Sequence, residues 1–174
     1  MASKSHQDAD PNAIIANEGD FIFKPKAFNI VWGNDSRYWR IPRSPIPEYD
    51  EQEAAELIQV SWLEVTGSVK LEPSTRYEIS FKLSFRRDSF GWSGAPIFLM
   101  AKVGKKGKYK WKRLKELDNL PKDPIMVPTD DSFTIEPILS NVPDKRLYFG
   151  LYEVWSGKWK GGLKVHEAIV RKLG

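Results

Sequence analysis

The 174-residue chain contains no cysteine and only two histidines, His6 and His166. Without cysteine it cannot form disulfides, thiolate zinc sites, iron–sulfur clusters or a cysteine nucleophile. His6 lies in a polar N-terminal stretch, and His166 lies in an expected strand, where we expect it to be structural or exposed. We therefore expect no catalytic residues, no metal site and no cofactor.

Long hydrophobic runs are also missing. The first residues, MASKSHQDADPNA, have no apolar core, so we expect no signal peptide. No run approaches the roughly 18 apolar residues that a membrane span needs. Hydrophobic residues make up 41% and charged residues 29%, which are globular proportions. We expect a cytoplasmic protein without membrane association, with a flexible tail over residues 1–18 and a single domain over residues 19–174.

Charge is distributed unevenly along the chain. Lysine and arginine total 27 against 23 acidic residues, for a net charge of +4, yet the segment Lys102–Lys115 holds eight cations and no acid. One interpretation is a solvated hairpin that turns at Gly104 and Gly107, with lysines that keep an edge strand from pairing with other chains. The alternative is a surface for RNA or another polyanion, or a nuclear-import signal, in which Tyr109 and Trp111 stack on bases. The candidate polyanion-binding residues are Lys105, Lys106, Lys108, Lys110, Lys112 and Arg113.

Short apolar runs separated by turn residues dominate the pattern. From Tyr77 to Phe85 apolar and polar residues alternate without exception, which predicts a half-buried strand. The residues Asp50–Gln59 are acidic at the start and rich in helix formers, which predicts one short helix. These features favour an all-β, antiparallel sandwich or barrel. Further strands are expected at Phe28–Trp32, Val60–Val65, Ile97–Val103, Tyr109–Leu114, Phe133–Ile135, Leu147–Leu151 and Leu163–Val170.

Seven tryptophans are more than a core of this size needs. Tryptophan is seldom fully buried, so several should line a surface or groove. Trp32 and Trp39 frame the polar loop Gly33–Tyr38, and Trp155 and Trp159 frame Ser-Gly-Lys. Aromatic rings beside dense hydrogen-bonding groups suit a carbohydrate, whose C–H face lies on a ring while its hydroxyls need donors and acceptors. The alternative is that these tryptophans pack the ends of the sandwich.

Glu153 continues the core-facing alternation of Leu147, Phe149 and Leu151. A carboxylate there must be paired or lie at the mouth of a cavity, so it either accepts hydrogen bonds from sugar hydroxyls or pairs with Arg40 or Lys158. Glycoside hydrolysis would need a second carboxyl at a set distance. The other acidic candidates have no spacing that ties them to it, and we therefore expect no enzyme activity; they are Asp35, Glu56 and Glu64.

Four blocks of the sequence resemble the plant phloem protein 2 family, which includes the Nictaba-type lectins. They are FNIVWGNDSRYWRIP around Trp32, Glu53–Val69, Thr75–Phe85 and the closing segment Gly150–Leu173. The blocks occur in the order of the family and cover most of Phe21–Leu173. The small cucurbit phloem lectins are similar in length.

This resemblance implies a jelly-roll-like β-sandwich that binds N-acetylglucosamine oligomers (chitin-type oligosaccharides) and N-glycan cores of glycoproteins. It also implies a non-enzymatic homodimer of the cytosol, phloem sap or nucleus, with a role in defence or phloem transport. Trp32, Trp39 and Glu153 match the positions that the family uses for sugar binding. Taken with the two aromatic loops, the candidate carbohydrate-binding residues are Trp32, Asn34, Tyr38, Trp39, Glu153, Trp155, Lys158 and Trp159.

Overall fold

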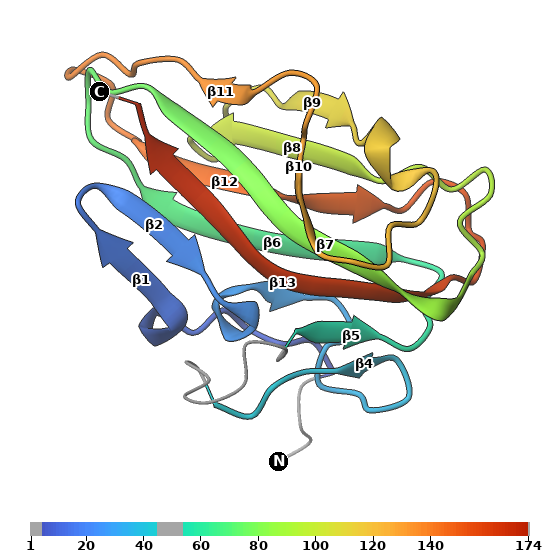
Figure 1. Cartoon of the computed structure of the whole chain (residues 1–174). Coiled ribbons are helices and arrows are strands. Elements are labelled where there is room, and N and C mark those ends of the chain that lie inside the picture. The colour runs from blue at the N-terminus through green and yellow to red at the C-terminus, as the bar shows by residue number, and fades with distance from the viewer. Residues whose placement is uncertain (1–4, 45–53, 174) are drawn as a thin grey trace.

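Two antiparallel sheets face each other in the computed structural model, which describes residues 5–44 and 54–173. In Figure 1 the long strands β7 and β13 lie in front of β6, β8 and β12. The eight-stranded sheet contains β1 (Ile14–Asn17), β2 (Asp20–Phe23), β13 (Gly161–Lys172), β5 (Ala55–Leu57) and β4 (Trp39–Arg40), with β7 (Tyr77–Phe90) joining β13 to β10 (Ile125–Val127) and β11 (Phe133–Ile135). The five-stranded sheet contains β3 (Asn29–Ile30), β6 (Leu63–Lys70), β12 (Arg146–Glu153), β8 (Phe98–Val103) and β9 (Lys110–Arg113). The expected all-β antiparallel sandwich is therefore confirmed.

The helix expected over Asp50–Gln59 is wrong where the structure describes it. Residues 50–53 lie outside the described residues, and Ala55–Leu57 form strand β5 between β4 and β13. Ala55 and Leu57 are fully buried while Glu56 is partly exposed, an alternation that a strand provides. Pairing with two strands outweighs the helix propensity of these residues. The helices of the described residues are short 3₁₀ turns: η1 (Pro11–Ala13), η2 (Pro25–Ala27) and η3 (Lys115–Leu117).

The expected N-terminal tail is part of the fold over residues 5–18. Strand β1 pairs with β2 along its whole length, and Gln7 forms a bridge with Ile30. The Gln7 side chain is buried and donates hydrogen bonds to the carbonyls of Pro25 and Phe28. The polar residues of this segment suggested a tail, but the Gln7 side chain instead provides hydrogen bonds to backbone carbonyls that would otherwise be buried without a partner.

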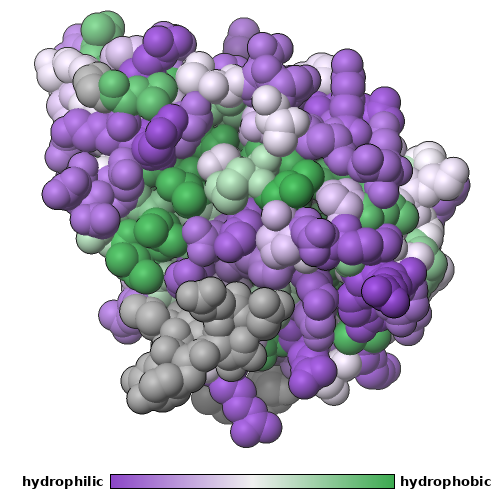
Figure 2. All heavy atoms as spheres, viewed as in Figure 1, coloured by the Kyte–Doolittle hydropathy of each residue, from purple (hydrophilic) through white to green (hydrophobic). Residues whose placement is uncertain are grey.

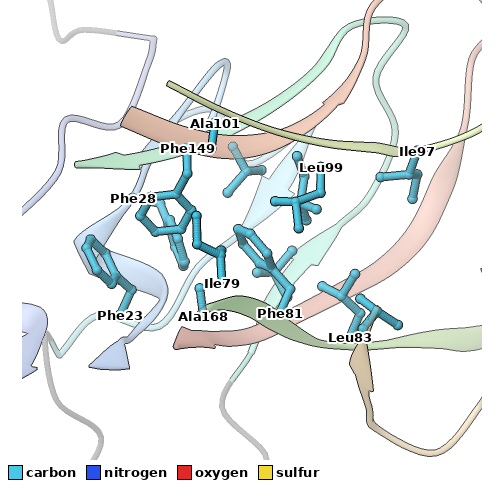
Figure 3. Close-up of a cluster of buried hydrophobic side chains, with 14 of the residues drawn as sticks. Phe23, Phe28, Ile79, Phe81, Leu83, Ile97, Leu99, Ala101, Phe149 and Ala168 are labelled. Carbon is cyan, nitrogen blue, oxygen red and sulfur yellow. The ribbon is translucent and has the colours of Figure 1, made fainter. Parts of the chain in front are cut away.

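The core fills the space between the two sheets. Figure 3 shows side chains from both sheets meeting there, with Phe149 and Leu99 on one side and Phe81 and Ala168 on the other. Phe149 stands edge-on to Phe23 at 4.9 Å between ring centroids. Outside, polar side chains cover most of the side seen in Figure 1, with hydrophobic patches near its centre and left edge (Figure 2). Burial of the alternating apolar residues is thus what holds the sheets together.

His166 lies at a bulge in β13, where the register with β7 shifts between Val165 and Glu167. The ring is 8% exposed, and its Nε2 lies 2.8 Å from the Ser84 hydroxyl. Burial, together with the charges of Lys82 and Lys164, lowers the pKa of His166 to about 4. The expectation of a structural histidine agrees with this placement.

His166 should make the fold less stable in mild acid. Because its pKa is depressed in the folded state, the unfolded chain takes up a proton below about pH 6.5 while the folded chain does not. At about 1.36 kcal/mol per pH unit, the free energy of unfolding should fall by about 3 kcal/mol between pH 6.5 and pH 4. The measurement is urea unfolding across this range for the wild type and for His166→Gln, in which that part of the slope should vanish. Parallel curves for the two proteins would contradict this role.

Candidate functional site

Five of the seven tryptophans are exposed, and they gather on two separate surfaces. Trp39 is the buried exception, and Trp92 is half-buried, where it donates to the Gly161 carbonyl at 2.9 Å. The exposed five are Trp32, Trp62, Trp111, Trp155 and Trp159, with exposed fractions between 39% and 63%. The expectation that several tryptophans line a surface is therefore confirmed.

The first surface is an aromatic row formed by Trp32, Tyr38 and Trp159. The Trp32 and Tyr38 rings lie 5.7 Å apart, and Trp159 stacks on Tyr38 at 6.4 Å with 27° between the ring planes. The guanidinium of Arg37 lies 5.1 Å from the centre of the Tyr38 ring. The row brings together the loop after β3 and the loop before β13, which are more than a hundred residues apart in sequence.

The loop Gly33–Tyr38 is held by its own hydrogen bonds. The amides of Tyr38 and Trp39 donate to the Asp35 carbonyl at 2.9 and 3.1 Å. The Asp35 carboxylate accepts from the guanidinium of Arg37 at 2.7 Å, and this hydrogen bond, with a second from the Arg37 amide, lowers the pKa of Asp35. Asp35 and Arg37, two polar residues of this loop, are thus occupied by each other.

The N-terminal segment braces Trp32 from behind. Trp32 has a φ of 64°, a conformation that is uncommon for a bulky residue. Its amide donates to Nδ1 of His6 at 2.8 Å, and the His6 ring packs edge-on against the indole at 5.2 Å. The Asn34 side chain donates to the His6 carbonyl at 2.9 Å. Gly33 allows this close approach, because a Cβ there would lie 2.9 Å from both Gln7 and Ile30.

Trp39 does not offer an exposed ring, contrary to expectation. Its side chain is 2% exposed and belongs to the core, because the two-residue strand β4 turns it inward against β5. It also lines a hollow of about 990 Å³ beside the Gly33–Tyr38 loop. The Trp39 Nε1 is buried without a hydrogen-bond partner. Other residues that line this hollow are Asn34, Ser36, Arg40, Glu56 and Lys164.

Glu153 is buried, 1% exposed, as the alternation of β12 predicts. Its partner is neither Arg40 nor Lys158 but Lys160, whose Nζ lies 2.9 Å away and is itself fully buried. The carboxylate also accepts from the Ser156 hydroxyl and from the amides of Trp155 and Ser156. Burial alone would raise the pKa of Glu153, but the hydrogen bonds from Ser156 and Lys160 outweigh it and lower the pKa. With both oxygens occupied, Glu153 holds the loop that follows it and is not open to a sugar hydroxyl.

Trp155 and Trp159 do not close one site together. Trp159 joins the aromatic row, whereas Trp155 packs edge-on against Phe98, at 5.2 Å, on the outer face of the five-stranded sheet. Lys158, between them, is exposed and donates through Nζ to the Ser93 carbonyl. The closing loop therefore serves two surfaces.

The basic segment is a hairpin of β8 and β9, as one of its two interpretations predicts. Three of its six candidate residues are engaged within the chain. The Lys110 ammonium donates to the Thr134 carbonyl at 2.7 Å, while Lys112 lies 3.3 Å from Asp130 and Arg113 lies 3.0 Å from Asp118. The other three, Lys105, Lys106 and Lys108, are exposed in the turn.

Some site residues escaped prediction. Lys160 lies among polar residues in the sequence, which do not indicate a buried cation, and only the expected burial of Glu153 requires one. Phe98 and Trp111 share a face of their hairpin, which the alternation of β8 could have indicated. In the part of the chain that the structure describes, no three histidine, aspartate or glutamate side chains are grouped to hold a metal ion. Nor do the described residues include a helix with the length and hydrophobicity to cross a membrane.

The fold and these surfaces define the class of the protein as a β-sandwich with exposed aromatic side chains. Comparison with known proteins gives its family. The phloem protein 2 family model matches residues 19–172, so the chain belongs to the phloem protein 2 family. The chain is 44% identical to Protein PHLOEM PROTEIN 2-LIKE A9 of Arabidopsis thaliana over 97% of both proteins. It is 28% identical to PHLOEM PROTEIN 2-LIKE A1 of the same plant, over 89% of this chain and 62% of that protein.

Two further likenesses are more partial. A lectin of Luffa acutangula is 33% identical over 44% of this chain and 38% of its own length. Among solved structures, a GH26-CBM35 β-(1,4)-mannanase of Podospora anserina superposes on 91% of this chain with a TM-score of 0.53, at 6% identity and over 28% of its own length. At that identity the likeness shows the fold alone.

Loss of the Glu153 charge should destabilise the fold rather than remove a ligand contact. Glu153→Gln leaves the fully buried Lys160 ammonium without its counter-charge, which should lower the free energy of unfolding by about 3–5 kcal/mol. In the wild type this contribution is present above the unfolded-state pKa and is lost as the pH falls through the depressed folded-state pKa of Glu153. Urea unfolding at neutral and acidic pH measures both effects.

Glu72→Gln is the matched control, since Glu72 is 63% exposed in its pair with Lys172 and should cost no more than about 1 kcal/mol. The double variant Glu153→Gln/Lys160→Met should recover much of the loss, because no buried charge remains. A stable Glu153→Gln protein that has lost sugar binding would instead return Glu153 to the site.

Proposed function

We propose that the chain is a non-catalytic lectin that binds N-acetylglucosamine oligomers and N-glycan cores at the aromatic row. The observation that supports the proposal is the row itself: Trp32, Tyr38 and Trp159, from segments distant in sequence, lie side by side, and both tryptophan rings are exposed. Membership of the phloem protein 2 family and the partial likeness to the Luffa acutangula lectin favour the same function.

Each part of the row has a distinct task in this proposal. Trp32 and Trp159, 39% and 53% exposed, stack on the C–H faces of successive pyranose rings, with Tyr38 between them. Lys158 precedes Trp159, and the hydrogens of its ammonium that are not donated to the Ser93 carbonyl donate to ring hydroxyls. The adjoining hollow is lined by Asn34 and Ser36, whose side chains supply polar groups for the acetamido group of the sugar.

The rings are preorganised by one another and by His6, so little rotamer freedom is lost on binding. A single sugar should still bind weakly, because its hydroxyls exchange water contacts for protein contacts with small net gain. Longer oligomers should bind better, because they cover more of the row.

Location and assembly are part of the same proposal. It places the protein in the phloem sap or cytosol, with N-glycosylated proteins as partners, a role in defence or transport, and a homodimer that would gain avidity on multivalent glycans. Membership of the phloem protein 2 family supports the phloem location. RNA binding through Lys105, Lys106 and Lys108 is the second candidate, supported by their exposure in the β8–β9 turn.

Replacement of Trp159 should abolish most of the sugar affinity. Titration calorimetry with N,N′,N″-triacetylchitotriose should give saturable binding to the wild type, and Trp159→Ala should weaken it about tenfold or more, since an exposed stacking ring is lost. Leu139→Ala, which truncates a side chain that is 70% exposed, is the control and should bind as the wild type does.

The same titration at about 50 and 500 mM salt separates the two candidate functions. Binding of a neutral oligosaccharide should barely change, whereas binding of an RNA oligonucleotide should weaken steeply through counterion release. No heat with triacetylchitotriose at either salt, or equal affinity of Trp159→Ala and the wild type, would contradict the proposed site.

A further inference from the structure

The outer face of the five-stranded sheet carries a second group of exposed aromatic rings. Trp111 and Trp155, 63% and 59% exposed, both stand edge-on to Phe98, with centroids 5.6 and 5.2 Å from it. Together with Met100 they line an apolar hollow of about 530 Å³. A contiguous apolar patch of this kind, unlike single exposed residues, marks a site of interaction or a ligand-binding groove.

A smaller, more polar hollow of about 250 Å³ lies on the same sheet. Tyr109 and Tyr148 line it, with the Lys102 ammonium 4.8 and 5.9 Å from their ring centres. Glu64 and Tyr152 line it too, and burial raises the pKa of the Tyr152 hydroxyl, which therefore stays protonated as a donor. Here the sheet offers a carboxylate, hydroxyls and an ammonium beside aromatic rings.

Strand register places the two hollows on one continuous face. Phe98, Met100 and Lys102 are alternate residues of β8, so their side chains point to the same side of the sheet. The first two line the apolar hollow and the third lines the polar one. Across the sheet Met100 lies opposite Gly150, which places no side chain between the hollows, and Phe98 lies opposite Tyr152.

We propose that this face is a second carbohydrate-binding site, separate from the aromatic row, for a linear, neutral, β-1,4-linked glycan. Four strands, β6, β12, β8 and β9, lie side by side beneath it. Three spacings of about 4.8 Å give a groove of about 14 Å across the strands, longer than one pyranose ring. An equatorially linked chain is a flat ribbon whose C–H faces can rest on Trp111 and Trp155 at one end while its hydroxyls meet Glu64 and Tyr152 at the other.

The charges of this face favour a neutral chain over a nucleic acid. Glu64 accepts from the Trp62 indole N–H at 3.2 Å and would repel phosphates. Two of the three cations near the rings are engaged: Lys102 donates to the Lys105 carbonyl at 2.8 Å and Arg113 pairs with Asp118, whereas Lys105 lines the polar hollow. A polyanion would have to displace these contacts and lie against a carboxylate.

The indole N–H resonances of ¹⁵N-labelled protein can read both surfaces at once. The seven signals are assigned by single Trp→Phe variants, and the protein is titrated with cellohexaose and, separately, with hexa-N-acetylchitohexaose. At least one hexamer should shift the signals of Trp62 and Trp111 on the outer face. Shifts of Trp32 and Trp159 report the aromatic row, so failure of either site is seen independently of the other.

Two matched tryptophan variants complete the test. Trp111→Ala should weaken the hexamer that moves the outer-face signals about tenfold while leaving the shifts of Trp32 and Trp159 in place. Trp159→Ala should do the reverse and leave the Trp62 and Trp111 shifts intact. Far-UV circular dichroism checks that both fold, as expected for side chains exposed by more than half.

The proposal is overturned if neither hexamer moves Trp62 and Trp111, or if Trp111→Ala binds with unchanged affinity. It is also overturned if an oligouridylate moves these signals at about 50 mM salt and loses its effect at about 500 mM while the hexamers do nothing, since that pattern identifies a polyanion site.

Discussion

The buried ion pair between Glu153 and Lys160 determines where the binding loops lie. Glu153 ends β12 in one sheet and Lys160 leads into β13 in the other, so the pair fixes both ends of the connection between them. Lys160 is held further by a two-way backbone bridge to Val60 and by the carbonyls of Ser61 and Lys158. Two fully buried charges are costly unless every donor and acceptor is satisfied, and here they are.

Because both ends are fixed, the loop between Glu153 and Lys160 can adopt few conformations. The Glu153 carboxylate draws in the amides of Trp155 and Ser156, so the chain turns sharply and sends Trp155 to one surface and Trp159 to the other. Rigid loops of this kind cost little entropy when a ligand binds. An ion pair that touches no ligand is therefore what positions the aromatic side chains.

Much of the fold was accessible from the sequence because alternation is a local signal. The strict pattern from Tyr77 to Phe85 predicted most of β7, and Phe133–Ile135 was placed to the residue. The short strands β4 and β5 carry too few residues for a pattern, and they exist only because neighbouring strands pair with them. A helical reading of residues 50–59 failed for that reason.

The candidate site was harder to predict, because contacts between distant segments decide it. The sequence could indicate that Glu153 is buried but not that Lys160, rather than Arg40 or Lys158, is its partner. Nor could it distinguish Trp32, whose ring is exposed, from Trp39, seven residues later, whose ring is in the core. The burial of Trp39 depends on the pairing of β4 with β5, and the exposure of Trp32 depends on what packs behind its loop.

The family match begins at residue 19, whereas the fold begins earlier. A domain excised at that boundary would lose β1 and leave one edge of β2 unpaired. An unpaired edge can add a strand from another molecule. It would also lose His6, whose Nδ1 accepts a hydrogen bond from the Trp32 amide and so holds the Trp32 backbone in its left-handed conformation. Residues that lie outside the family match thus hold the aromatic row in place. A fragment that begins at the match would aggregate more readily, and its binding surface would be less well ordered.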